Sequence, residues 1–233
     1  MDSITTFRGI KIFSLFTFAF LLGECMASRG TISVPMNPDM GALRVSKKIP
    51  ATVGLFISQE NKYYSYKGTP PPGSEFSGLE HSFPLGKALE KISMQRFSQY
   101  YREVKLVSPP LEAKDFKIII EPQIEEFAFR YDYITKGSGS STFEYVVSTV
   151  TLKVNVTFYG DGKRIWNRSL KASSAPKEIL MSGRNFDYKE AIGEAASQAL
   201  VDSVSRIAEE LSVAPEVEDY LADIAPTIPN RRG

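Results

Sequence analysis

The stretch that decides the fold is VTLKVNVTFYGDGKRIWNRSLKAS, residues 150–173. Apolar and polar side chains alternate strictly from Val150 to Tyr159, and this period of two predicts a strand with one buried and one wet face. Asp161-Gly162 is a two-residue hairpin signal of type I′, and Lys163–Ser173 supplies the return strand. The stretch therefore predicts an antiparallel hairpin whose apolar face must be covered by another layer.

Two segments on either side of this hairpin have helical periodicity. Residues 84–104, PLGKALEKISMQRFSQYYREV, place their apolar side chains on one helical face, and residues 187–211 carry a broad apolar stripe. Gly193 lies inside the second segment, where glycine costs roughly 1 kcal/mol relative to alanine. We therefore expect close packing against the helix at Gly193.

Further strands are predicted at residues 51–58 and 115–133, with a short one in KLVSPP, residues 105–110. Pro122 in the strand 115–133 indicates a bulge or a sheet edge. Antiparallel hairpins with one wet face need a cover for the other face. The order strand, helix, four strands, helix therefore predicts an α+β two-layer sandwich. In it, two helices pack on one face of a mixed, mainly antiparallel sheet of four or five strands.

The N-terminus has the pattern of an export signal. Arg8 and Lys11 precede eleven uncharged residues, Ile12–Leu22, a run too short to span a bilayer but typical of a secretory leader. We expect a signal peptide over residues 1–24, a linker or tether over 25–50, a single α+β domain over 51–213 and a mobile tail over 214–233.

Cys25 is the only cysteine of the chain, and it follows the leader directly. LLGEC, residues 21–25, resembles the bacterial lipobox, although Glu24 stands where a small residue is usual. Lipidation of Cys25 would tether the protein to a membrane. Cleavage after Ala27 would instead discard the cysteine and release a soluble periplasmic or secreted protein. Either route explains a lone thiol in an exported chain.

Residues suited to catalysis are scarce. The chain has a single histidine, His81, which the pattern places in a surface loop beside Glu80, so no His-rich zinc site can form. The adjacent carboxylates of Glu125 and Glu126 should point to opposite faces of a strand and be solvated. We expect no metal, no cofactor and no catalytic residue; an enzyme would need a deep pocket around His81 or a carboxylate in an apolar site. A net charge of +1 argues against nucleic acid as a partner.

Aromatic residues gather near the ends of the predicted strands. Tyrosine is favoured at interfaces because it combines apolar area with a polar end. One interpretation makes the tyrosines the rim of a partner or ligand site, and the other makes the accompanying phenylalanines plain core. The candidate rim residues are Tyr63, Tyr64, Tyr66, Tyr131, Tyr133 and Tyr145.

The order of these segments resembles that of YajG-type bacterial outer-membrane lipoproteins. The resemblance covers roughly residues 20–213 and is carried by the leader with its cysteine, ATVGLFIS, LGKALEKISMQRFSQYY, DFKIIIEPQIEEF, the hairpin 150–173 and YKEAIGEAASQALVDSVSRIAEEL. It implies an outer-membrane lipoprotein facing the periplasm. More distantly, the layout is similar to that of auxiliary lipoproteins of envelope transport and lipopolysaccharide assembly.

Two functions follow from these observations. The first is an envelope-anchored lipoprotein that acts noncatalytically, as a binding or accessory component beside another envelope protein. The alternative is a periplasmic carrier or sensor of an apolar ligand such as a lipid, held between helices and sheet. The partner and the oligomeric state are left open by the sequence.

Overall fold

The computed structural model describes most of the chain between Gly30 and Ile224. The described residues are 30–41, 45, 48–72, 78–108, 115–138, 141–175, 177–180 and 188–224. The expected signal peptide, Cys25 and the last nine residues lie outside them.

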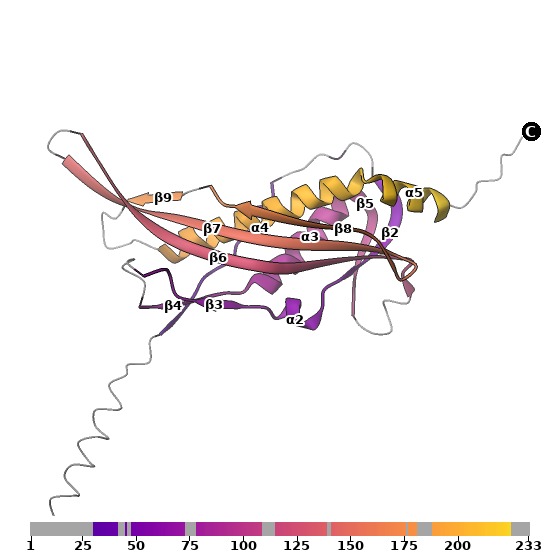
Figure 1. Cartoon of the computed structure of the whole chain (residues 1–233), viewed down its shortest axis with the longest axis horizontal. Helices are drawn as coiled ribbons and strands as arrows, with labels where there is room; N and C mark the ends of the chain where they lie inside the picture. Colours follow the sequence, from indigo (N-terminus) through magenta and orange to yellow (C-terminus); the bar gives the residue numbers. More distant parts are fainter. Residues whose placement is uncertain are drawn as a thin grey trace, which may run out of the picture.

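The predicted hairpin is the centre of the structure. β6 (Ile118–Ser138) pairs with β7 (Ser141–Gly160), and β7 pairs in turn with β8 (Lys163–Ser173), both antiparallel. Asp161 and Gly162 have φ of 47° and 75°, as a type I′ turn requires, so the predicted turn is confirmed. The β6–β7 hairpin is long, and its tip extends beyond the body of the molecule (Figure 1).

These strands belong to a six-stranded sheet of order β5-β2-β6-β7-β8, with β9 (Lys177–Leu180) also beside β7. β2 (Ile49–Phe56) pairs in parallel with both β5 (Tyr101–Val107) and β6. A second sheet of order β1-β4-β3 consists of Thr31–Ser33, Glu80–Phe83 and Tyr66–Gly68, and β1 and β4 are parallel.

The sequence-based sheet is therefore wrong in two respects. The described strands form sheets of six and three, not one of four or five, and three of the pairings are parallel. Strands of three or four residues among prolines and glycines are too short to show a period of two. The α+β class with helices against a sheet is confirmed.

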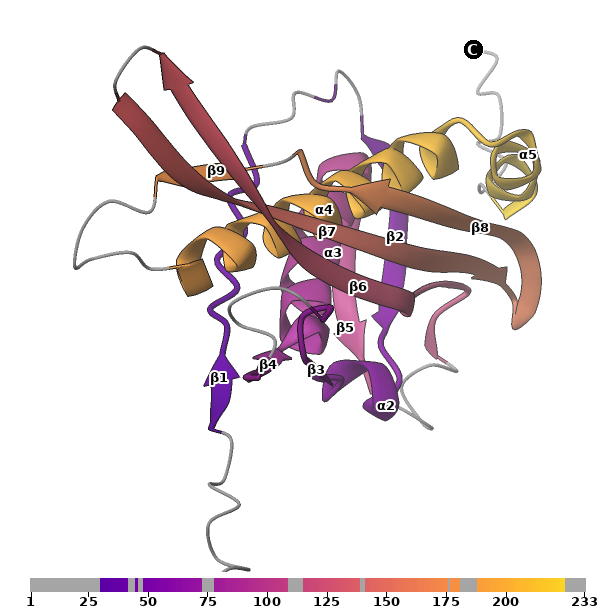
Figure 2. The same cartoon turned by 60° about the vertical axis from the view of Figure 1, so that its left-hand side comes forward.

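Two long helices cover one face of the large sheet (Figure 2). α4 (Tyr188–Ser212) matches its predicted range closely. α3 (Leu85–Tyr100) ends four residues earlier than predicted, because the chain continues directly into β5 at Tyr101, whose ring is fully buried. Between the helices and the sheet lies the core, to which β7 contributes Val150, Leu152, Val154, Val156 and Phe158, all fully buried.

The segment before β2 is packed against this core. Val34 and Met40 are buried, and the buried Arg96 of α3 donates a hydrogen bond to the Met40 carbonyl. A Cβ on Gly193 would lie 2.0 Å from the Pro35 carbonyl oxygen. The close packing expected at Gly193 is therefore confirmed, and the neighbour is this N-terminal segment.

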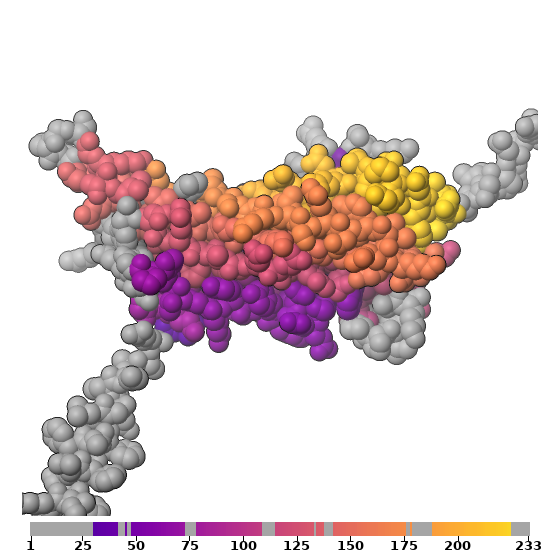
Figure 3. Space-filling view, in the orientation of Figure 1, coloured from indigo at the N-terminus to yellow at the C-terminus, as the bar shows by residue number. Residues whose placement is uncertain are grey.

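Two short helices complete the described structure. α2 (Gln59–Lys62) lies in the stretch that the sequence assigns to a loop. α5 (Pro215–Ile224) begins just after α4 and lies at the end of the sheet opposite the β6–β7 tip (Figure 1). In the space-filling view, β3, β4 and α2 form a band along the lower side of the long strands (Figure 3).

Candidate functional site

An open groove of about 1000 Å³ lies where β2, β5, the start of β6 and α5 meet. Its walls are mainly apolar, and four separate segments supply them. Ile49 and Ala51 come from β2, Phe116 precedes β6, Ile118 begins it, and Leu221 and Ile224 come from α5. A groove with mainly apolar walls and a few charged groups is the usual form of a binding site.

The charged residues of this groove are mostly basic. Arg102 and Lys105 on β5 and Lys117 before β6 line it, and Asp115 is the acidic lining residue. All four side chains are exposed, so the cations lie at the rim while the apolar groups form the floor. An elongated apolar group that ends in a negative charge would match both features.

Tyr220 fixes α5 as one wall of the groove. Its hydroxyl lies 3.0 Å from Asp161 Oδ2 and 3.2 Å from the Lys117 carbonyl oxygen. Burial, together with the hydrogen bond to Asp161, raises the pKa of Tyr220 to about 12. The ring packs on Gly160, where a Cβ would lie 2.4 Å away, so only glycine leaves room for this ring.

A second cluster, the aromatic cluster, joins the small sheet to β6. Tyr66 of β3 and Phe83 of β4 each lie 4.8 Å from Phe127 by ring centroids, and Phe83 lies 5.0 Å from Phe129. Phe127 and Phe129 are 8% and 7% exposed, so the interpretation of these phenylalanines as core is confirmed.

His81 belongs to this cluster, and its predicted place in a surface loop is wrong. It is fully buried in β4, with ring centroids 5.3 Å from Phe129 and 5.9 Å from Tyr188. Nδ1 lies 3.1 Å from the Leu79 carbonyl, while Nε2 has no hydrogen-bond partner among the described residues. Burial lowers the pKa of His81, the Leu79 contact opposes this, and Lys189 lowers it further.

The six candidate tyrosines do not form one rim. Tyr66 and Tyr131 both lie in the aromatic cluster, and Tyr131 is only 5% exposed. Tyr64 is half-buried, and burial raises its pKa. Tyr63 is 73% exposed after α2, and Tyr145 lies on the projecting hairpin with Lys136 Nζ 5.5 Å from its ring. Tyr133 is in β6, and its side chain is outside the described structure.

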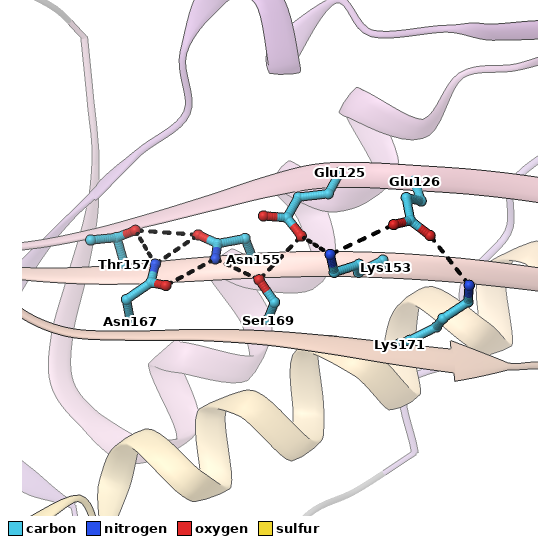
Figure 4. A network of polar contacts seen from close by, with 8 residues as sticks. All are labelled: Glu125, Glu126, Lys153, Asn155, Thr157, Asn167, Ser169 and Lys171. Atoms are coloured by element: carbon cyan, nitrogen blue, oxygen red, sulfur yellow. Dashed lines mark hydrogen bonds and ion pairs between the residues drawn. The ribbon is translucent and has the colours of Figure 1, made fainter.

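The outer face of the sheet carries a continuous polar network (Figure 4). Asn155 exchanges hydrogen bonds with Asn167 and donates to Ser169, while Asn167 also donates to Thr157. Ser169 donates to Glu125, which extends the network to the charged residues of β6. Asn155 and Thr157 are buried by this network although they face away from the helices.

Glu125 and Glu126 share one face of the sheet, contrary to the sequence-based expectation. A β-bulge between Ile124 and Glu126 adds one residue to β6 and turns both carboxylates toward Lys153. Lys153 Nζ lies 3.0 Å from Glu125 and 3.6 Å from Glu126, and Lys171 lies 3.3 Å from Glu126. The pair is therefore neutralised by lysines and not arranged for acid–base chemistry.

The groove is the site that sequence reasoning missed. Its lining residues come from separate segments between Ile49 and Ile224, and none belongs to a motif. The exposed cations on β5 are the one signal visible in the sequence, and three charges among seven residues are ordinary for an edge strand.

Within the described ranges, no three His, Cys, Asp or Glu side chains are grouped as metal ligands. None of the described helices is both long enough and apolar enough to cross a membrane.

Comparisons with known proteins give fold likenesses only. No family model matches the chain, and no curated protein does. Among solved structures, a putative neuraminyllactose-binding hemagglutinin homolog from Helicobacter pylori is 16% identical, with a TM-score of 0.47, covering 79% of this chain and 99% of that one. A protein from Xanthomonas campestris is 15% identical, with a TM-score of 0.41 and coverages of 77% and 92%.

A minor lipoprotein from Acinetobacter baumannii is 12% identical, with a TM-score of 0.34, covering 69% of this chain and 91% of that one. At these identities and scores the likenesses establish neither a family nor a function. The specific resemblance to YajG-type lipoproteins stays a prediction.

Proposed function

We propose that the protein is an exported, envelope-anchored lipoprotein that acts noncatalytically, by binding another envelope component in the groove between β2, β5 and α5. The groove is the single observation that carries the proposal, because its apolar floor is wide, open and built from ordered elements. The leader and Cys25 support the anchor, which would place the domain on the periplasmic side of the outer membrane.

In this proposal the groove receives an apolar segment of a partner protein. Burial of apolar surface supplies roughly 25 cal/mol per Å², so a floor of this kind favours association without any chemistry. Residues 26–48 would still separate Cys25 from β2, although β1 and the buried residues Val34 and Met40 lie within that range.

A second candidate is a carrier or sensor of an apolar ligand such as a lipid. The observation that favours it is the position of Arg102, Lys105 and Lys117 beside the apolar floor. An acyl chain could lie on the floor while its anionic end contacts these cations. The two candidates share the site and differ in the occupant.

The anchor is tested by metabolic labelling with a clickable palmitate analogue in a bacterial host. The wild-type chain should take up label, and Cys25→Ala should not. An unlabelled wild-type chain, or label that persists in Cys25→Ala, would overturn the lipoprotein assignment.

The groove is tested by photocrosslinking in intact cells. A benzophenone amino acid replaces Ala222 on α5, and a matched control replaces Phe143, which is 48% exposed on the distant hairpin. We expect an adduct from position 222 alone. A protein-sized adduct supports the first candidate, a lipid-sized adduct supports the second, and no adduct at 222, or equal adducts at both positions, would reject the groove as the site.

A further inference from the structure

The first half of β2 has one edge that no described strand pairs. β5 pairs with β2 on one side from Ile49 to Phe56, whereas β6 pairs with the other side only at Gly54 and Leu55. None of residues 49–52 is buried. Within the described ranges, no turn, loop or side chain hydrogen-bonds to their backbone. An open edge of this kind is a template for another strand.

The groove of the proposed site runs along this open edge. Its lining includes four consecutive residues of β2, namely Ile49, Pro50, Ala51 and Thr52. Ile49 and Ala51 pack against the core, whereas Thr52 hydrogen-bonds to Glu103 on the outer face of the sheet. A groove over one face would meet only one of these two sets, so lining by both places it beside the strand. Pro50 fits this position, because proline has no N–H and is confined to strand edges and bulges.

Helix α5 forms the opposite wall of the groove. β6 begins only at Ile118, and beyond that point α5 lies across the groove from β2, with Leu221 and Ile224 in its lining. The hydrogen bond from Tyr220 to Asp161 fixes the helix in this place. β2, β5 and α5 lie together at the end of the molecule opposite the β6–β7 tip (Figure 1). The open edge of β2 and the helix therefore bound a slot, called the β2–α5 slot below.

We propose that the β2–α5 slot receives an extended segment of the partner protein, which adds a strand beside residues 49–52 of β2. Addition of an extended peptide to an open sheet edge is a recurring mode of protein recognition. The inference rests on the proposed function, because it names the form of the segment that the groove binds. Four residues of a strand span about 13 Å, so the added strand is roughly four to five residues long.

The core side of the β2–α5 slot is apolar. Ile49 and Ala51 of β2 pack against the core from one wall, and Leu221 and Ile224 of α5 pack against it from the other. Successive side chains of a strand point to opposite faces, so every second side chain of the added strand would meet these apolar groups. Burial of those side chains drives association in proportion to the apolar area removed from water. Every second residue of the partner segment is therefore apolar.

The charged rim of the slot selects the side chains between them. Arg102 and Lys117 line the groove, are exposed and have no ion pair among the described residues, whereas Lys105 lies 3.2 Å from Glu103. Asp115 is the acidic residue of the described lining, so the rim carries an excess of positive charge. Complementary charge across an interface fixes the register and excludes wrong partners. The added strand therefore alternates apolar with acidic side chains.

The test uses random heptapeptides displayed on phage and selected on the full chain in detergent. The selected sequences should alternate apolar with acidic residues. Fluorescence anisotropy of synthetic copies should show a loss of about tenfold or more in affinity for Arg102→Glu/Lys117→Glu, because the rim then repels the acidic side chains. Lys67→Glu/Lys91→Glu is the matched control, since both lysines are exposed on β3 and α3 and have no described ion pair, and it should bind as the wild type does.

Strand addition itself is tested by N-methylation of the peptide backbone. Alternate residues of a strand direct their N–H groups to opposite edges, so only one alternate set can bond β2. Methylation of that set should abolish binding, and methylation of the other set should leave it nearly unchanged. Equal losses from both sets, or no loss from either, would overturn strand addition.

The Ala222 photocrosslink separates this inference from the proposed function. A protein-sized adduct at Ala222 without any peptide binder would keep the proposed function and overturn the added strand. A lipid-sized adduct would also overturn the added strand, because a lipid cannot pair with β2. The absence of both peptide binders and an adduct would overturn the two together. Selected peptides that lack the alternating apolar and acidic pattern would overturn the assigned partner chemistry.

Discussion

The two faces of β7 use the same backbone in opposite ways. On the inner face, Val150 to Phe158 give every second side chain to the core beneath α3 and α4. On the outer face, Lys153, Asn155 and Thr157 pair with polar side chains of β6 and β8 (Figure 4). The inner face is stabilised by removing apolar area from water, and the outer face by polar groups that satisfy one another.

The comparison shows which buried polar side chains destabilise the folded state. Asn155 is buried on the outer face but bonds to Asn167 and Ser169. His81 is buried on the inner side among aromatic rings, and Nε2 has no hydrogen-bond partner within the described residues. A satisfied polar group costs little, whereas an unsatisfied one keeps its desolvation penalty. The four predictions below test this difference, from the largest effect to the smallest.

Truncation on the inner face should have the largest effect. Leu152→Ala removes a fully buried side chain between sheet and helices, and we expect a loss of about 2–5 kcal/mol in the free energy of unfolding. Thr151→Ala, one residue earlier on the outer face, is the control and should change it by about 0.5 kcal/mol. Urea denaturation measures both. Equal losses would show that the two faces do not differ as proposed.

Breaking the outer network should cost less. Asn155→Ala leaves Asn167 and Thr157 with unmade hydrogen bonds, and we expect a loss of about 1–3 kcal/mol by the same urea titration. Asn155→Val/Asn167→Val replaces both amides with strand-favouring apolar groups and should cost less than the single variant. If the losses of stability from the single substitutions simply added in the double variant, the two amides would not share a network.

The inner face was the more predictable of the two. Strict alternation over residues 150–159 identified β7, its buried side and the turn at Asp161-Gly162, because one wet face and one dry face impose a period of two. The outer network was not predictable. It depends on the β-bulge at Glu125, which moves Glu125 and Glu126 to one face, and Pro122 alone does not show at which residue the alternation shifts.

The burial of His81 and the presence of the groove were missed for a related reason. β4 has four residues, too few to show periodicity, so its histidine was assigned to a loop although it is fully buried. Phe116, Arg102 and Leu221 meet only through tertiary packing of distant segments. Pro122, by contrast, was taken as a sign of a bulge or an edge, and a β-bulge follows it between Ile124 and Glu126.

Acid should destabilise the inner side through His81. Its pKa is lowered by burial, so the unfolded chain takes up a proton at a higher pH than the folded one. Stability is therefore fully present above the unfolded value of 6.5 and falls as the pH drops through that value toward the lowered one. The urea midpoint should decline between about pH 7 and pH 5.5. His81 is the only histidine, so His81→Phe should flatten this slope, and an unchanged slope in that variant would assign the decline to other groups.

Removal of an outer-face charge should have the smallest effect. Lys153→Met breaks the contacts to Glu125 and Glu126, but these groups are solvated, and water screens most of their attraction. We expect a shift in the urea midpoint smaller than that of Asn155→Ala, and none in about 1 M salt, where the Debye length is about 3 Å. Arg168→Met, which breaks an exposed pair with Glu210 on the helix side of the sheet, is the matched control and should behave alike. A loss of stability that occurs only in Lys153→Met and persists in about 1 M salt would mean that Glu125 and Glu126 need this lysine for folding. A small, screened shift in both variants would instead leave the buried amides of Asn155 and Asn167 as the stabilising part of the outer network, with the charges keeping that face wet.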